Sequence, residues 1–110
     1  KVIKLNPNLS QAYQNLGLAY KSINKNALAM HYFHQALEYN PDLVQSVNSI
    51  AALLREVGDV DQATAFYKRS TEILPDRVDS LLALGAQYLA SEQTEKAITT
   101  LEKVLKLDLV

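Results

Sequence analysis

The sequence predicts an all-α fold in which antiparallel helix pairs stack side by side. Within each segment, apolar residues recur at spacings of three and four, which is the pattern of one face of an α-helix. Residues of similar size also return every 34 positions along the 110 residues. A fixed period of this length indicates a repeat array in which each repeat is one helical hairpin.

The repeated positions are defined by their size and shape. In the first copy they are Tyr13, Leu16, Gly17, Tyr20, Ala29, Phe33, Ala36 and Pro41. In the second copy they are Val47, Ile50, Ala51, Leu54, Ala63, Tyr67, Ser70 and Pro75. In the third copy they are Leu81, Leu84, Gly85, Tyr88, Ala97, Leu101, Val104 and Leu109.

The period and these landmarks resemble the tetratricopeptide repeat family over the whole chain. The resemblance implies a right-handed α-solenoid of antiparallel helix pairs. We expect repeats at residues 10–43, 44–77 and 78–110, the last atypical at its end, after the end of a preceding repeat at 1–9. The chain begins with Lys1 and not with Met, so we expect a fragment of a longer array.

Three prolines mark the repeat boundaries. Pro7, Pro41 and Pro75 lie 34 residues apart, each in a short polar turn. Proline lacks an amide donor and disfavours helix in the residue before it, so each should end one helix and precede the next. Residues 1–5 are then predicted to be the last turns of a truncated helix.

The first predicted pair consists of a helix at residues 9–22, a polar break at 24–26 and a partner with an apolar face from Ala29 to Leu37. The second pair is predicted at 43–57 and 59–74. Gly58 suits the left-handed backbone that follows a helix end, and Asp59 can cap the next helix.

The third predicted pair occupies residues 78–90 and 94–107, and the turn between them contains no glycine. Residues 104–110 are apolar where a terminal repeat usually carries a polar cap. Small residues are expected where two helices cross closely, so the small residues of the first helices should face those of their partners. The expected pairs are Gly17 with Ala29, Ala51 with Ala63, and Gly85 with Ala97.

Composition excludes several classes of function. Lysine and arginine number 11 against 12 acidic residues, so no basic excess favours nucleic acid. No cysteine is present, which excludes disulfides and thiolate metal sites. No apolar run approaches the ~20 residues that span a bilayer, so we expect no membrane insertion. The compartment stays open, with the cytoplasm favoured.

No pattern indicates catalysis or a cofactor. There is no nucleophile elbow and no glycine-rich phosphate loop, so we expect a non-enzymatic protein. His31, His34 and Glu38 have a spacing that could present three ligands to one metal ion. The resemblance places both histidines on the outer face of a second helix, which favours a solvated surface pair.

In tetratricopeptide arrays the first helices of the repeats form a curved inner wall that binds protein segments. The resemblance therefore implies a partner-binding groove for a peptide or helix. Its expected residues are Gln11, Gln14, Asn15, Leu18, Lys21, Gln45, Asn48, Ser49, Ala52, Arg55, Asp79, Leu82, Ala83, Ala86 and Leu89.

This surface changes character along the chain. Amides such as Gln14, Asn15 and Asn48 can hold an extended peptide backbone, because they both donate and accept. The third repeat offers an apolar surface instead. One subclass of the family clamps the acidic carboxyl terminus of chaperones through lysines, arginine and asparagines. Its positions here carry Gln14, Leu18, Ser49, Asp79 and Ala83, which disfavours that ligand.

Two alternatives remain open from the sequence. The chain could be a substrate-recruiting arm of a larger enzyme, as in glycosyltransferases whose related arrays carry an asparagine row. That row reads Asn15, Ser49 and Ala83 here, so the similarity is partial. The chain could also be a scaffold that self-associates through its terminal repeats, because the third repeat is apolar and its end lacks a polar cap.

Overall fold

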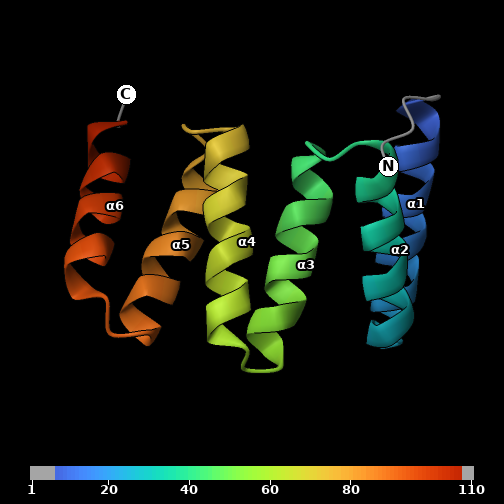
Figure 1. The fold of residues 1–110 in the computed structure, drawn as a ribbon, viewed down its shortest axis with the longest axis horizontal. Coiled ribbons are helices and arrows are strands. Elements are labelled where there is room, and N and C mark those ends of the chain that lie inside the picture. The colour runs from blue at the N-terminus through green and yellow to red at the C-terminus, as the bar shows by residue number, and fades with distance from the viewer. Residues whose placement is uncertain (1–6, 108–110) are drawn as a thin grey trace.

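The computed structural model describes residues 7–107, which form six α-helices and no strand (Figure 1). Their bounds are α1 Pro7–Ser22, α2 Asn26–Tyr39, α3 Val44–Glu56, α4 Val60–Ile73, α5 Val78–Ala90 and α6 Thr94–Lys106. The predicted all-α fold is confirmed, and the observed helix ends fall within about two residues of the predicted ones. The truncated helix predicted at residues 1–5, and Leu109, lie outside the described residues.

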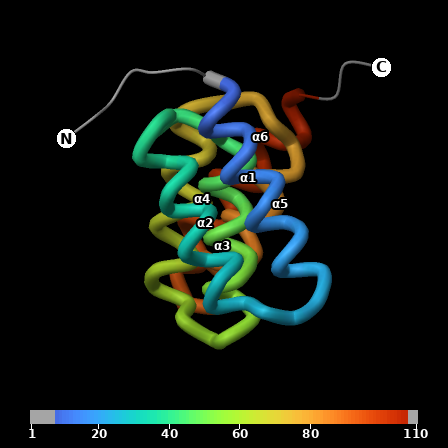
Figure 2. The backbone as a smooth tube through the Cα atoms, turned by 90° about the vertical axis from the view of Figure 1, so that its right-hand side faces the viewer, coloured from blue at the N-terminus to red at the C-terminus, as the bar shows by residue number. Residues whose placement is uncertain are grey.

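The helices follow one another as three antiparallel hairpins, α1 with α2, α3 with α4 and α5 with α6 (Figure 1). Neighbouring hairpins pack through α2 on α3 and through α4 on α5. Viewed end on, the first hairpin covers the later ones, as expected for a stack (Figure 2). We call α1, α3 and α5 the A helices and α2, α4 and α6 the B helices.

The prolines do not all act as predicted. Pro41 and Pro75 lie in the turns before α3 and α5, whereas Pro7 is the first residue of α1. Proline is tolerated at the first helical position because its missing amide hydrogen needs no partner there, and its fixed φ is already helical. Pro41 and Pro75 therefore lie between helices as predicted, and Pro7 begins a helix.

Each hairpin turn contains one residue with a left-handed backbone. These residues are Asn24, Gly58 and Glu92, with φ values of 64°, 86° and 62°. They are 34 positions apart, so the three hairpins share one turn geometry. Gly58 was predicted for this conformation, and the cap expected from Asp59 is confirmed, since its side chain accepts from the backbone N–H of Gln62 at 3.1 Å.

We expect Glu92→Gly to stabilise the protein by about 1 kcal/mol, because a left-handed backbone costs a non-glycine residue roughly 1–2 kcal/mol and glycine's extra freedom in the unfolded chain offsets part of the gain. Thermal unfolding measures the change. Asn24→Gly is the matched control, since asparagine tolerates this backbone better and should gain less. A lower melting temperature for Glu92→Gly would contradict the shared turn geometry.

The core lies at the joints between hairpins and forms two clusters. The first joins α1 and α2 to α3 and α4, and contains the fully buried Phe33, Val47 and Ile50. The second joins α3 and α4 to the last hairpin around Tyr67 and Leu84. Apolar burial of this kind is the main favourable contribution to folding.

The close approach at the glycines differs from the prediction. The ring of Phe33, not Ala29, supplies the nearest atoms to the position that a Cβ of Gly17 would occupy, at 2.5 Å. At Gly85 the side chain of Leu101, not Ala97, takes this place, at 2.6 Å. The glycines therefore make room for a large side chain from the B helix, four residues after the expected alanine.

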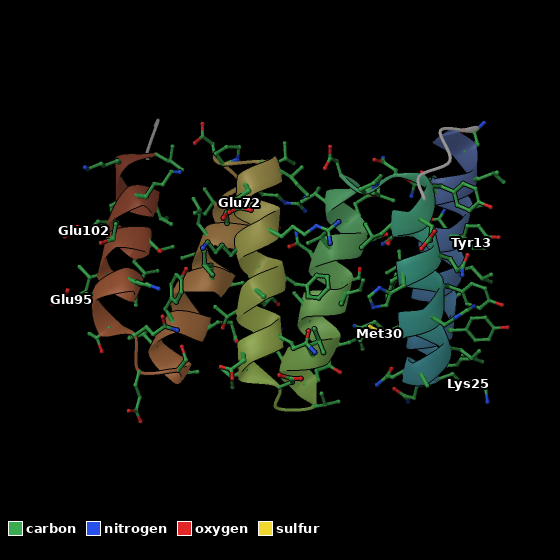
Figure 3. The ribbon with its side chains drawn as sticks, viewed as in Figure 1. Tyr13, Lys25, Met30, Glu72, Glu95 and Glu102 are labelled. Carbon is green, nitrogen blue, oxygen red and sulfur yellow. The ribbon has the colours of Figure 1, made fainter. Side chains whose placement is uncertain are left out.

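Four tyrosines form a stacked row on the first hairpin. Tyr13 stacks between Tyr32 and Tyr39, with ring centroids 6.1 and 5.6 Å apart, and Tyr20 stacks on Tyr32 at 5.5 Å. Figure 3 shows Tyr13 on the outer side of this hairpin and Met30 on the side that faces the next hairpin. The equivalent residues of the second repeat include Leu54 and Phe66, which, like Tyr20, pack against the first cluster.

At the other end of the array α6 exposes large apolar side chains. Ile98 is 50% exposed and Leu105 is 75% exposed, in agreement with the expectation of an apolar end. Among the described residues, no helix has the length and apolar character needed to cross a bilayer.

Candidate functional site

The A helices enclose two shallow cavities on one side of the molecule. The first has a volume of about 350 Å³ and lies between α1 and α3. Its lining residues are Gln11, Gln14, Asn15, Leu18, Lys21, Gln45, Asn48, Ser49, Ala52 and Arg77. The second, of about 290 Å³, continues toward α5 and is lined by Asn48, Ala52, Arg55, Tyr67, Arg77, Asp79, Ser80 and Ala83.

The two cavities share Asn48, Ala52 and Arg77, so they are parts of one trough across the three A helices. We call this trough the inner groove. Asn15 and Asn48 lie on the same wall of it, although they are 33 positions apart in the chain. Twelve of the fifteen residues that the sequence placed on this surface line one cavity or the other.

Leu82, Ala86 and Leu89 line neither cavity. They lie on α5 beyond the groove, where Leu82 is 49% and Leu89 is 53% exposed. Their spacing of seven residues places these two leucines on the same face of the helix. The apolar surface expected in the third repeat is thus present, but it is open and not hollowed.

Gln14 has a different role from the predicted one. It is only 3% exposed, and its Oε1 accepts a hydrogen bond from the hydroxyl of Ser46 while its Nε2 donates to Ser49 at 3.4 Å. Burial of an amide is costly unless its polar atoms are paired, and here both are paired across the α1–α3 contact. Gln14 joins two repeats and has no free group for a peptide backbone.

Asn48 repeats this connection one repeat later. Its Nδ2 donates to the hydroxyl of Ser80 at 3.1 Å, and Ser80 in turn exchanges a hydrogen bond with Ser70 at 2.8 Å. Both amides therefore reach a serine 32 positions further along the chain. Unlike Gln14, Asn48 keeps one buried atom unpaired, since within residues 7–107 no donor reaches its Oδ1. Asn48 lines both cavities, but this oxygen atom is itself buried.

Asn15 is one of the exposed amides that line the inner groove. It is exposed on α1, and its Oδ1 accepts one hydrogen bond from Gln11 one turn earlier, at 3.2 Å. An exposed bond of this kind contributes little to stability. Asn15 can therefore exchange its partner for a ligand at small cost.

The charge in the inner groove is mainly positive. Lys21 and Arg55 occupy the same position of successive repeats, and Arg55 lies over the ring of Tyr67 at 5.9 Å. Arg77 forms an ion pair with Asp79 at 2.8 Å, and this bond lowers the pKa of the Asp79 carboxyl below its usual value. The negative charge of Asp79 is therefore paired.

Three lining residues were not expected from the sequence: Tyr67, Arg77 and Ser80. Nor was Ser46, which bonds Gln14 behind the first cavity. One signal could have found the serines, because Ser46 and Ser80 are small polar residues one period apart on otherwise apolar helix faces. Arg77 lies in a turn, where the helix periodicity carries no information. Burial raises the pKa of Tyr67, so its phenol stays protonated beside the groove.

The histidines lie outside the inner groove, on the outer side of α2. His31 contacts the ring of Tyr32 edge on, and His34 contacts Phe66 of α4 in the same way. Burial lowers the pKa of His34, and the nearby charges of Arg69 and His31 lower it further. In the described part of the chain, no three side chains of histidine, cysteine, aspartate or glutamate gather closely enough to hold a metal ion.

Comparison with known proteins agrees with the fold. Sequence profiles of the tetratricopeptide repeat match residues 10–43 and 79–108, which together are more than half of the chain. A search of curated protein sequences gives no match.

Many solved structures are similar. A crystal structure of MamA superposes with a TM-score of 0.85 at 20% identity over 94% of this chain. The first tetratricopeptide domain of Spaghetti (RPAP3), bound to the HSP90 peptide SRMEEVD, gives 0.85 at 16% identity, with 96% of this chain and 84% of that one covered. The N-terminal domain of stress-induced protein-1 from C. elegans gives 0.83 at 16% identity, with coverages of 93% and 86%.

This chain spans 61% of the length of the MamA chain that it matches. At these identities the superpositions show a shared fold. The repeated helical hairpins, the left-handed turn residue of each hairpin and the profile matches all agree, and the chain belongs to the tetratricopeptide repeat family.

Proposed function

We propose that the inner groove binds an extended segment of a partner protein, and that the chain acts by binding and not by catalysis. The observation that carries the proposal is the continuity of the two cavities across α1, α3 and α5. An extended peptide needs such a trough, together with polar groups that reach its main chain. Two structures of similar fold, the first and second tetratricopeptide domains of Spaghetti (RPAP3), contain a bound HSP90 peptide.

The polar groups of the groove suit a peptide main chain. The exposed amide of Asn15 both donates and accepts, and the exposed amide of Gln45 lines the same cavity. Because amides recognise backbone groups that every residue carries, these contacts demand little of the peptide sequence. They supply affinity, and the neighbouring charges supply selectivity.

The charges favour an acidic segment followed by an apolar one. Lys21 and Arg55 form a row along the A helices, and the same position of the third repeat is the exposed Leu89. Acidic side chains beside the first two repeats would be attracted by this row, and an apolar side chain would cover the leucine. The clamp for a terminal carboxylate is not part of this proposal, since Gln14 is buried and Leu18 carries no charge.

Asn15→Ala is expected to weaken such a peptide about fivefold to tenfold, because one net hydrogen bond contributes about 1 kcal/mol. A random peptide library displayed on phage yields the ligand, and fluorescence anisotropy measures its Kd. The melting temperature should stay unchanged, since Asn15 loses only an exposed bond to Gln11.

Gln62→Ala is the matched control, because this exposed glutamine lies on α4 away from the groove. Asn48→Ala is a poorer probe, since Asn48 also bonds Ser80 across the repeat contact and its loss would mix binding with stability. Equal affinities of the Asn15→Ala and Gln62→Ala variants would reject the proposed placement of the peptide.

A further inference from the structure

A third cavity lies outside the inner groove, where α4, α5 and α6 meet, and its volume is about 400 Å³. Its floor is formed by Leu81 and Leu84 of α5, which are 3% and 4% exposed. These two leucines lie on the opposite side of α5 from Asp79 and Ala83 of the groove, as the helical period requires. We call this space the outer cavity.

The equivalent positions of the preceding repeat show which side chains are missing from the outer cavity. One period earlier, the positions of Leu81 and Leu84 hold Val47 and Ile50, which are completely buried. They are covered there by Leu37, which belongs to the same buried cluster, and by the partly buried ring of Phe66, which packs against that cluster.

In the last repeat, threonines stand at the two covering positions. Thr71 takes the place of Leu37, and Thr100 takes the place of Phe66, and both line the cavity. The outer cavity is therefore the space that a leucine and a phenylalanine fill elsewhere in the same chain. An apolar side chain from outside would restore the packing of the preceding joint.

Two of the three threonines around the outer cavity have paired hydroxyls, which do not oppose an apolar occupant. Thr71 and Thr99 donate their hydroxyls to the backbone of their own helices, at 2.7 and 3.1 Å. Because each hydroxyl already has an acceptor, neither needs another when the cavity is filled. The rim carries the ammonium groups of Lys103 and Lys106 against the single carboxylate of Glu102, so its charge is positive.

We propose that the outer cavity is a second docking site, which takes a phenylalanine-sized side chain of a partner peptide with acidic residues on either side. The ring occupies the place that Phe66 holds in the preceding repeat, and the carboxylates lie near Lys103 and Lys106. This site is separate from the inner groove and does not depend on its function. A cavity of this size matches the volume of typical small binding sites, about 300–1,000 Å³.

Titration with a short peptide tests the proposal directly. The probe is the tripeptide Asp-Phe-Asp, acetylated and amidated at its ends, and the readout is the amide chemical shifts of the labelled protein. We expect saturable changes at Leu81, Leu84 and Thr100 with a Kd of about 1 mM, since each atom of a small ligand contributes little. The controls Asp-Ala-Asp and Asn-Phe-Asn, which lack the ring or the charges, should bind at least fivefold more weakly. Equal binding of either control, or no change at the cavity, would overturn the proposal.

Filling the cavity tests the packing argument separately. The double variant Thr71→Leu, Thr100→Phe copies the preceding joint, and should raise the melting temperature by about 4–8 °C and abolish the peptide-induced shifts. Thr94→Phe is the matched control, because this exposed threonine begins the same helix but lies outside the cavity. A double variant that melts below the wild type, or that still binds the peptide, contradicts the proposal.

Discussion

Replacing Phe33 with alanine is expected to lower the free energy of unfolding by about 3–5 kcal/mol. The ring is fully buried and lies in the cluster that joins the first hairpin to α3. Its removal loses buried apolar surface and leaves a cavity between two repeats. Because the whole free energy of unfolding of a native domain is only about 5–15 kcal/mol, the variant should keep little stability. Urea denaturation followed by circular dichroism measures the loss.

Phe66→Ala is the control for this prediction, since it removes the same ring from a half-buried position of α4. Partial burial predicts a loss of about 1–2 kcal/mol there. The difference between the two variants measures how much the repeat contact depends on the position of Phe33. If Phe33→Ala cost no more than Phe66→Ala, the core would not lie where the structure places it.

Gly17→Ala should destabilise the protein by about 1–3 kcal/mol, although helix propensity alone predicts a gain of about 1 kcal/mol. The added methyl group would lie 2.5 Å from Cε1 and 2.6 Å from Cδ1 of Phe33. The ring is fully buried in a close-packed interior, so it has little room to move aside. Overpacking therefore outweighs propensity, and the same denaturation experiment gives the sign.

Gly85→Ala separates these two effects. Its methyl group would meet Leu101 at 2.6 Å, but Leu101 is only half-buried and its flexible side chain can turn away. We expect a cost below about 1 kcal/mol at this position, because the propensity gain offsets part of the clash. A Gly17→Ala variant more stable than Gly85→Ala would show that Phe33 is not held against α1.

The helices were predictable because helix and turn signals depend on local chemistry. Apolar spacing located all six helices of the described residues, and Gly58 and Asp59 marked one hairpin turn through backbone and capping preferences. Glu92 has the same left-handed backbone without any such signal. The repeated hairpin imposes this conformation on Glu92, against the preference of the residue itself. It could therefore be predicted only because Glu92 lies one period after Gly58.

The inner groove was predictable as a surface but not as a set of contacts. The repeat register places Gln14 and Asn48 on the A helices, but it does not say which amide is buried against a serine. Which amide is buried depends on the side-chain rotamers and on the partners that the neighbouring helix places nearby. For the same reason the sequence did not predict that Arg77, which lies in a turn, lines the groove and pairs with Asp79.

The outer cavity could not be predicted from any single repeat. Thr71 and Thr100 are ordinary residues for a half-buried helix position. Their effect appears only when the last joint is compared with the preceding one, where Leu37 and Phe66 are in place. Packing volume is a property of several elements together, so a pattern of apolar spacing does not show it.

The central claim is that the A helices of three successive repeats offer one continuous surface to a partner segment. Amide chemical-shift mapping with a peptide selected from a library tests it most directly. The account predicts that the largest changes fall on Asn15, Asn48, Ala52 and Ala83, which belong to three different helices of the inner groove. Changes confined to the outer faces of α2, α4 and α6 would contradict it.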